Sequence, residues 1–423
     1  MKLSKIFLAT ILLMVVNDPV VPKQIDLKEV LAPVVSSNPL PALAAIVFDD
    51  QKVIASGAIG VRKFGDPTLV TIEDSFHLGS CTKAMTATLA ARIVERGEIS
   101  WTTTVKEALD LQKVDSGLEN ITLLELMSHT AGMPAILKNQ WPDLWKTLYY
   151  RTTWQKGAKG RAERLKVAKL LFSASPAQAV GSYTYSNAGF MVAAAMLEAA
   201  TDTEWENLMR TELFKPLGMK NCGFGPAARP DKVDQPWPHS LIKDKPVPVN
   251  REWITPMKDI FAKWYEKKNH TMEIRAPESW DNPRSVGPAG TVSCTISDWA
   301  KFGQLHLSDG GDYISTENMS KLHEVRNTSA RSALGWFSYK RSWAGGTALT
   351  HTGSNLFNFA IVWISPTKKK GVMVATNIGD GKTRGKIFKI LDGVVWQLIQ
   401  AHFLQDKMSH GLNILVSKMG SHA

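Results

Sequence analysis

The chain has 423 residues, of which 44% are hydrophobic and 21% are charged, and its formal net charge is +11. These values allow a sizeable core and exclude a low-complexity chain, so we expect a globular protein apart from the N-terminus. The basic residues are scattered, and their longest run, Lys368-Lys369-Lys370, follows Ser365-Pro366-Thr367 as in a solvated turn. Composition therefore does not predict nucleic-acid binding, although a positive field can attract anionic substrates or surfaces.

The N-terminus carries a charged and then an apolar segment. Lys2 and Lys5 precede the run Ile6–Val16, which is too short to span a bilayer comfortably and is typical of a signal peptide. No A-x-A-like cleavage site is evident after it, so residues 1–22 are interpreted as a signal peptide or an uncleaved anchor. We expect an exported protein that is periplasmic, secreted or membrane-anchored, and that contacts a membrane only through this segment.

The predicted elements follow in chain order from hydrophobic periodicity and from turn and cap residues. A helix over 82–96 ends at Gly97, and Ser297-Asp298 is expected to cap a helix that runs to about residue 307. The other expected helices cover 121–127, 188–200 and 386–403. Strands are expected over 42–48, 52–59, 334–339, 348–351, 357–364 and 372–376.

Strands thus lie at both ends of the chain, while helices and loops fill the middle. The simplest α/β (α+β) architecture is one sheet built from both ends, with a mostly helical region inserted between them. The stretch 226–283 is rich in Pro and contains Trp237, Trp253, Trp264 and Trp280. It is interpreted either as a functional loop or as a surface excursion whose tryptophans pack onto the body.

The three cysteines are Cys81, Cys222 and Cys294. An odd and sparse set does not predict a disulfide framework, and the spacing matches no metal site. We therefore expect three small buried thiols, with Cys81 pointing into the packing of its helix.

Ser80-Cys81-Thr82-Lys83 is an S-x-x-K tetrad at the start of a predicted helix. Residues three apart share a helix face, so Lys83 can reach the Ser80 hydroxyl. A serine needs a base to become a nucleophile, and a lysine shielded from water can be neutral often enough to serve. The pattern also occurs at Ser240 and Ser365, but neither of those serines opens an apolar helix.

Tyr185-Ser186-Asn187 lies just before the apolar helix expected from residue 188. A tyrosine at such a position can point its phenol into a cleft and pass protons to and from a leaving group. Asn187 offers both a donor and an acceptor for a substrate amide. The alternative is an ordinary turn followed by a helix N-cap.

His351-Thr352-Gly353-Ser354 ends a predicted strand. Gly353 permits close backbone approach, so the strand edge can lie along a bound substrate with the N–H of Ser354 facing a carbonyl oxygen. Taken alone, His351 is typical of a polar residue at a strand end.

In this order and spacing, the three motifs resemble the serine β-lactamase and penicillin-binding-protein superfamily. The Y-x-N motif makes the chain more similar to class C β-lactamases, low-molecular-weight D-Ala-D-Ala peptidases and related esterases. The resemblance covers roughly residues 40–402. It is supported by the stretches LELMSHTAGMP (124–134), YSNAGF (185–190), FKPLGM (214–219) and PAGTVSCTISDWAKF (288–302).

The resemblance implies a central antiparallel sheet flanked by helices, with the site between the sheet and the inserted domain. The implied domains are a discontinuous α/β unit over 23–105 and 288–405, a mostly helical insertion over 106–287, and a tail over 406–423. Ser80 would attack a carbonyl while Lys83 and Tyr185 handle protons. Asn187 and the His351–Ser354 strand would orient substrate, and the N–H groups of Ser80 and Ser354 would form the oxyanion hole.

The third motif begins with His351, where class C β-lactamases usually have Lys. The change removes a permanent positive charge, so strong recognition of a β-lactam carboxylate is not expected. A histidine at this place is expected to titrate near neutrality.

The sequence therefore predicts a serine hydrolase acting on an amide, β-lactam or ester carbonyl of a small molecule or peptide, including peptidoglycan fragments. The alternatives within this fold are a D-Ala-D-Ala carboxypeptidase, a D-aminopeptidase and a carboxylesterase. A non-catalytic penicillin-binding sensor is a further alternative. No G-x-S-x-G elbow occurs, which argues against an α/β-hydrolase. Neither a metal nor an organic cofactor is implied.

Overall fold

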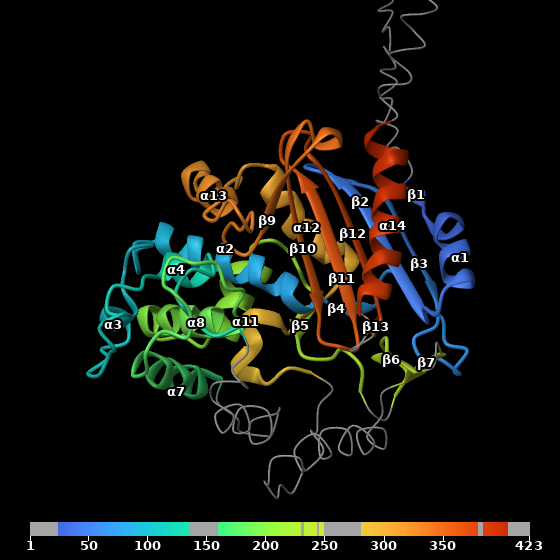
Figure 1. Cartoon of the computed structure of the whole chain (residues 1–423). Coiled ribbons are helices and arrows are strands. Elements are labelled where there is room, and N and C mark those ends of the chain that lie inside the picture. The colour runs from blue at the N-terminus through green and yellow to red at the C-terminus, as the bar shows by residue number, and fades with distance from the viewer. Residues whose placement is uncertain are drawn as a thin grey trace, which may run out of the picture.

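The computed structural model describes residues 24–135, 160–229, 232–242, 245–248, 281–379 and 384–404 (Figure 1). The predicted signal or anchor segment, the C-terminal tail, and Trp253, Trp264 and Trp280 lie outside the described residues. Within the described part of the chain, no helix is both long and apolar enough to cross a membrane.

A seven-stranded sheet forms the centre of the molecule (Figure 1). Its neighbours pair antiparallel, except that β1 runs parallel to β3. Strands from the two ends of the chain meet at β2 and β12, which confirms the mostly antiparallel sheet built from both ends. The order is β1 (Ile25–Asp26), β3 (Val53–Gly60), β2 (Ala42–Asp49), β12 (Lys370–Thr376), β11 (Phe359–Ser365), β10 (Gly346–Ser354) and β9 (Phe337–Arg341).

Both faces of this sheet are buried, because apolar residues occupy successive positions of its central strands. In β2, Ala44 and Ile46 face one core, whereas Leu43, Ala45 and Val47 face the other. The first core includes α12 (Ile296–Leu307) and α2 (Thr82–Glu95), and the second includes α1 (Lys28–Ser37) and α14 (Arg384–Phe403). The helices on both faces confirm the flanked sheet that the sequence predicts.

The middle of the chain supplies a group of helices beside the sheet (Figure 1). Arg164 is fully buried here, and its guanidinium pairs with the carboxylates of Glu198 and Glu206. This cluster ties together α7, α8 and α9. The whole helical group consists of α3 (Val105–Ala108), α4 (Leu123–Met127), α7 (Gly160–Phe172), α8 (Asn187–Thr201), α9 (Trp205–Leu208) and the π-helical turn η3 (Met209–Phe214).

Two small sheets join this middle part to the rest of the chain. One has the order β4 (Ser75–His77), β8 (Val292–Thr295) and β5 (Cys222–Phe224). The other has the order β13 (Ile378–Gly379), β6 (His239–Ile242) and β7 (Lys245–Pro248). The short elements left are η1 (Gly79–Cys81), η4 (Arg284–Val286), α11 (Gly287–Gly290), α13 (Thr316–His323) and η5 (Ser342–Ala344). The domain boundaries given above stay a prediction.

The expectation of three free thiols is wrong for two cysteines. Cys222 and Cys294 face each other directly on β5 and β8 and form a disulfide. They are 72 residues apart, and only the pairing of these strands brings them together. Cys81 is a free buried thiol as predicted, and burial raises the pKa of its thiol.

Several element boundaries differ from the prediction, and β10 runs on to Ser354 where a strand ending at His351 was expected. The cap of α12 is Thr295 rather than Ser297, because the Thr295 hydroxyl accepts the backbone N–H of Asp298 at 3.2 Å. β9 begins at Phe337, three residues later than expected.

Trp237 of the Pro-rich stretch is buried against Val233 and Phe357. Its indole donates to the carbonyl oxygen of Lys232 at 2.7 Å. For this tryptophan, packing onto the body is therefore the correct interpretation.

Candidate active site

Ser80 lies in the single turn η1, directly before α2. One helical turn later, the Lys83 ammonium nitrogen lies 3.1 Å from Ser80 Oγ. The same nitrogen donates to the carbonyl oxygen of Ala289 in α11 at 2.7 Å. Lys83 is thus held against the hydroxyl, as the S-x-x-K spacing predicts.

Lys83 is completely buried, and this burial lowers the pKa of its amine from 10.5 to about 7. Its nitrogen lies 4.8 Å from the ring centre of Tyr185 and 5.7 Å from that of Phe190. Aromatic rings are poor substitutes for water around an ammonium group, although their faces attract it weakly. Neutral Lys83 is therefore abundant near pH 7 and is able to accept a proton from Ser80.

Tyr185 lies on the loop before α8, with its ring close to both Lys83 and His351. His129 holds this loop on either side of the tyrosine. Its carbonyl oxygen accepts the N–H of Thr184 at 2.8 Å, and its Nδ1 accepts the N–H of Ser186 at 3.0 Å. The two rings lie 4.6 Å apart.

His129 carries no signal of this role in the sequence, where it follows a helix end and resembles an ordinary loop residue. Its positive φ of 63° is a feature of the fold that no local motif marks. Burial lowers the pKa of His129 well below its ordinary value, so the ring stays neutral and Nδ1 can accept.

Asn187 is the first residue of α8. The cap is Ser186, whose hydroxyl accepts the N–H of Gly189 at 3.3 Å, so the Asn187 side chain is not used as a cap. Asn187 Oδ1 is buried and has no hydrogen-bond partner among the described residues. Such an oxygen is a ready acceptor for a donor on a substrate.

The end of β10 lies directly against the turn η1 that contains Ser80. A side chain on Gly353 would overlap the Leu78 carbonyl oxygen and reach within 2.7 Å of the Ser80 amide nitrogen. A side chain on Gly79, whose φ is +49°, would overlap the amide nitrogen of Ser354. Because neither Gly79 nor Gly353 has a side chain, the backbone segments can approach closely, and the amide N–H groups of Ser80 and Ser354 lie near each other.

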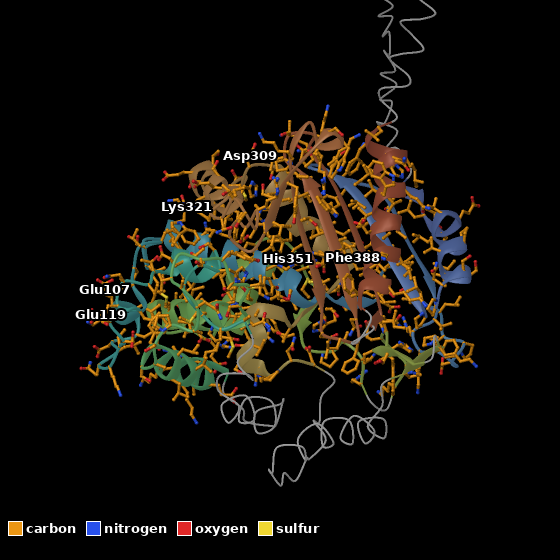
Figure 2. All side chains as sticks on the ribbon, viewed as in Figure 1. Glu107, Glu119, Asp309, Lys321, His351 and Phe388 are labelled. Atoms are coloured by element: carbon orange, nitrogen blue, oxygen red, sulfur yellow. A yellow bond between two sulfur atoms is a disulfide. The ribbon has the colours of Figure 1, made fainter. Side chains whose placement is uncertain are left out.

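His351 lies on β10 and is buried, in the middle of the molecule (Figure 2). Its ring lies 5.4 Å from that of Phe337, and its Nδ1 lies 2.6 Å from the carbonyl oxygen of Thr352. Thr352 and Ser354 are only half-buried. The structure therefore brings Ser80, Lys83, Tyr185 and His351 together, with Asn187 at the start of the adjoining helix.

The expectation that His351 titrates near neutrality is wrong. Burial, and then the nearby charge of Lys83, lower the pKa of His351 to about 3. The ring is neutral over the whole physiological range, and it presents no switchable charge to a substrate.

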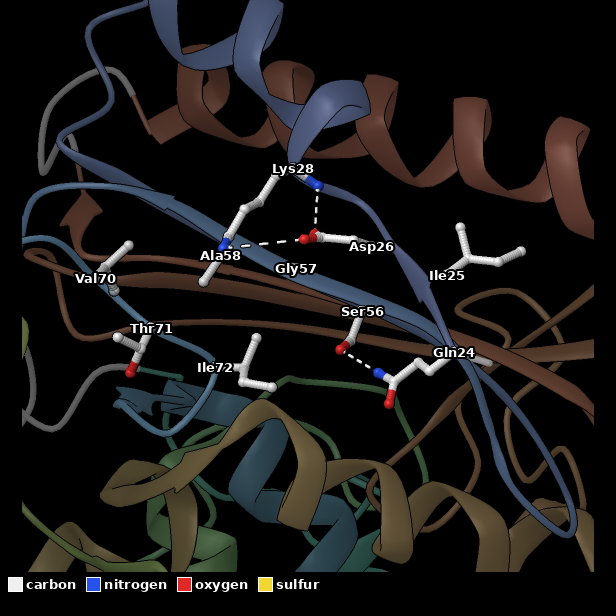
Figure 3. A pocket seen from close by; sticks show the side chains of 10 residues that line it. All are labelled: Gln24, Ile25, Asp26, Lys28, Ser56, Gly57, Ala58, Val70, Thr71 and Ile72. Atoms are coloured by element: carbon white, nitrogen blue, oxygen red, sulfur yellow. Dashed lines mark hydrogen bonds and ion pairs between the residues drawn. The ribbon is translucent and has the colours of Figure 1, made fainter. Parts of the chain in front are cut away.

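A separate cavity of about 410 Å³ opens beside β1 and β3 (Figure 3). Its wall includes the ion pair of Asp26 with Lys28, at 3.9 Å, and the side chains of Gln24 and Ser56. Neither Ser80 nor any of its partners lines this cavity, so it is not part of the candidate active site.

The sequence matches the family model described as Beta-lactamase over residues 27–391. It is 25% identical over 357 residues to Penicillin-binding protein 4 of Amycolatopsis lactamdurans, a match that covers 81% of each chain. The fold is similar to that of D-alanine carboxypeptidase AmpC from Burkholderia cenocepacia, with a TM-score of 0.60 and 21% identity. It is also similar to EstCE1, a hydrolase with promiscuous acyltransferase activity, with a TM-score of 0.67 and 16% identity. Each structural match covers 87% of this chain and 97% of the other. Since the family model spans most of the sequence, the chain belongs to the Beta-lactamase family.

Proposed function

We propose that the protein is a serine hydrolase that forms an acyl-enzyme on Ser80. The observation that carries this proposal is the buried Lys83 amine, 3.1 Å from Ser80 Oγ, with its pKa lowered to about 7. Burial of a lysine beside a serine costs free energy, which a merely structural pair does not require. A lysine of this kind is suited to act as a general base.

In the proposed reaction, neutral Lys83 takes the hydroxyl proton as Ser80 Oγ attacks a carbonyl carbon. The carbonyl oxygen becomes negative and accepts hydrogen bonds from the N–H groups of Ser80 and Ser354. Each such donor typically contributes about 3 kcal/mol to the transition state. Tyr185 passes a proton to the leaving group as the tetrahedral intermediate collapses, and water then releases the acyl group from Ser80.

The substrate class follows from the third motif. Neutral His351, packed against Phe337 and near Tyr185, offers no fixed charge to a carboxylate. Asn187 Oδ1 offers an acceptor to an amide N–H. We therefore propose that amides and esters without an essential carboxylate at this place are preferred over β-lactams. Peptidoglycan peptides that end in a free carboxylate are the contrasting substrates to test, because one structural neighbour is a D-alanine carboxypeptidase, and they should react more slowly than neutral amides and esters.

Intact-protein mass spectrometry after incubation with a penicillin and with an activated neutral ester tests this proposal. We expect a covalent adduct with the ester, and its loss in Ser80→Ala. Ser240→Ala is the matched control, because Ser240 opens a second S-x-x-K pattern on β6 and should label normally. Unchanged labelling of Ser80→Ala would rule out the assignment.

We also propose that the protein is exported. The signal-like segment at residues 1–22 supports this, as does the disulfide of Cys222 with Cys294, because stable disulfides are rare in reducing compartments. Fractionation of native cells is the test, and protein confined to the cytosol would contradict the proposal.

A further inference from the structure

A buried histidine holds the backbone just before the nucleophile. His77 ends β4, and its Nδ1 accepts the N–H of Gly79 at 3.1 Å. An accepting Nδ1 has no hydrogen, so the proton of the neutral ring is on Nε2. That nitrogen lies 2.8 Å from Asp281 Oδ1, and the two side chains are 2% and 0% exposed. The carboxylate lies off the N–H axis, so this is a close polar contact rather than a linear hydrogen bond.

The same carboxylate reaches the other side of the site. Asp281 Oδ1 accepts from Asn355 Nδ2 at 3.2 Å. Asn355 directly follows Ser354, and its own Oδ1 accepts the N–H groups of Phe357 and Asn358 at 3.2 and 3.0 Å. Asn355 therefore fixes the turn in which β10 ends, and Asp281 fixes Asn355.

One buried carboxylate thus connects two short segments that are far apart in sequence. One segment contains Gly79, next to Ser80, and the other begins immediately after Ser354. The contact of Gly79 with Gly353 and Ser354 sets how closely these segments approach. The network of His77, Asp281 and Asn355 adds polar contacts that hold each segment in a fixed direction.

We infer that Asp281, His77 and Asn355 are positioning residues for the oxyanion hole, an inference that rests on the proposed acyl-transfer function. The network sets the distance and direction of the Ser80 and Ser354 N–H groups without touching the substrate. Donors of this kind act only when they lie about 2.7–3.1 Å from the developing oxyanion. A displacement of about 1 Å costs on the order of a hundredfold in rate.

The first test compares an activated oxoester with the corresponding thionoester, whose sulfur is a weaker acceptor for the oxyanion hole. Asp281→Ala should lower kcat/KM for the oxoester by about ten- to a hundredfold and kcat/KM for the thionoester much less. The preference for the oxoester, which is the ratio of these two kcat/KM values, should therefore shrink. Asp281→Asn keeps a side-chain oxygen that can contact both His77 and Asn355, so it should retain most of the preference for the oxoester.

His323→Asn is the matched control. His323 in α13 is half-buried, and its Nε2 lies 2.8 Å from Nδ1 of the buried His306, away from the oxyanion hole. Its replacement should affect stability without altering the oxoester-to-thionoester ratio. An equal loss on both esters in Asp281→Ala, or the same ratio change in His323→Asn, would overturn the inference.

The second test does not depend on activity. Hydrogen-exchange mass spectrometry should show faster exchange in Asp281→Ala for the peptides that contain Gly79 and residues 355–358, but not in His323→Asn. If Asp281→Ala does not fold, His77→Asn replaces it, because the asparagine oxygen can still accept from Gly79 while the link to Asp281 is lost. Unchanged exchange at residues 355–358 in that variant would equally overturn the inference. A wild-type enzyme that no ester acylates would instead contradict the proposed function, and the exchange measurement would still decide whether the network exists.

Discussion

The lowered pKa of Lys83 leads to a specific pH dependence for acylation of Ser80. Only the neutral amine can accept the hydroxyl proton, so the rate should rise with pH through about 7. At pH 7 about half of the Lys83 amines are neutral, compared with about one in three thousand for a lysine with the ordinary pKa of 10.5. At pH 5 the neutral fraction falls to about 1%, so kcat/KM should be about fiftyfold lower than at pH 7.

The assay is kcat/KM for a neutral activated ester between about pH 5 and 8.5, because such a substrate does not titrate. The neighbouring histidines do not produce this inflection, since the pKa of His351 is about 3 and that of His129 is well below its ordinary value. Lys83→Arg is the control, because a guanidinium stays protonated throughout. A flat wild-type profile, or an inflection near pH 7 that persists in Lys83→Arg, would refute the role of Lys83 as base.

Three further predictions concern charge and stability. His351→Lys should raise kcat/KM for a carboxylate-bearing substrate relative to a neutral ester by about tenfold, and no gain in the variant would contradict this. In the wild type, the ratio of kcat/KM for these two substrates should stay flat from about pH 5.5 to 8.5 apart from titration of Lys83. Replacing Cys222 and Cys294 by Ser should lower the free energy of unfolding by about 4 kcal/mol, given their separation of 72 residues, and urea denaturation that shows no loss would count against it. Arg164→Met leaves two buried carboxylates without a counter-charge and should cost about 3–5 kcal/mol in the same assay, whereas a cost under about 1 kcal/mol would show that the pairing is dispensable.

Much of the fold is predictable because its signals are local. The apolar periodicity of α2 and α8 and the near-continuous apolar runs of the C-terminal strands reflect burial that is repeated along each element. The S-x-x-K spacing likewise places Lys83 against Ser80 through helix geometry alone. These features require no knowledge of distant partners.

The features that sequence reasoning misses depend on distant partners. The disulfide needs the pairing of β5 with β8, and the histidine at 77 acquires its role only from a carboxylate two hundred or so residues later. The lowered pKa of His351 also depends on residues far away in the sequence, because groups on other elements bury its ring. No local motif marks any of these three.

The meeting of η1 with the end of β10 also has a consequence for the timing of activity. Synthesis proceeds from the N-terminus, so Ser80 and Lys83 emerge from the ribosome long before Ser354. Until β10 has paired with β11 and lies over Gly79, the chain contains the proposed nucleophile but only half of the proposed oxyanion hole. The proposed acyl transfer therefore requires β10 to be in place, so a chain that ends before this strand would carry Ser80 with only one of the two proposed oxyanion donors.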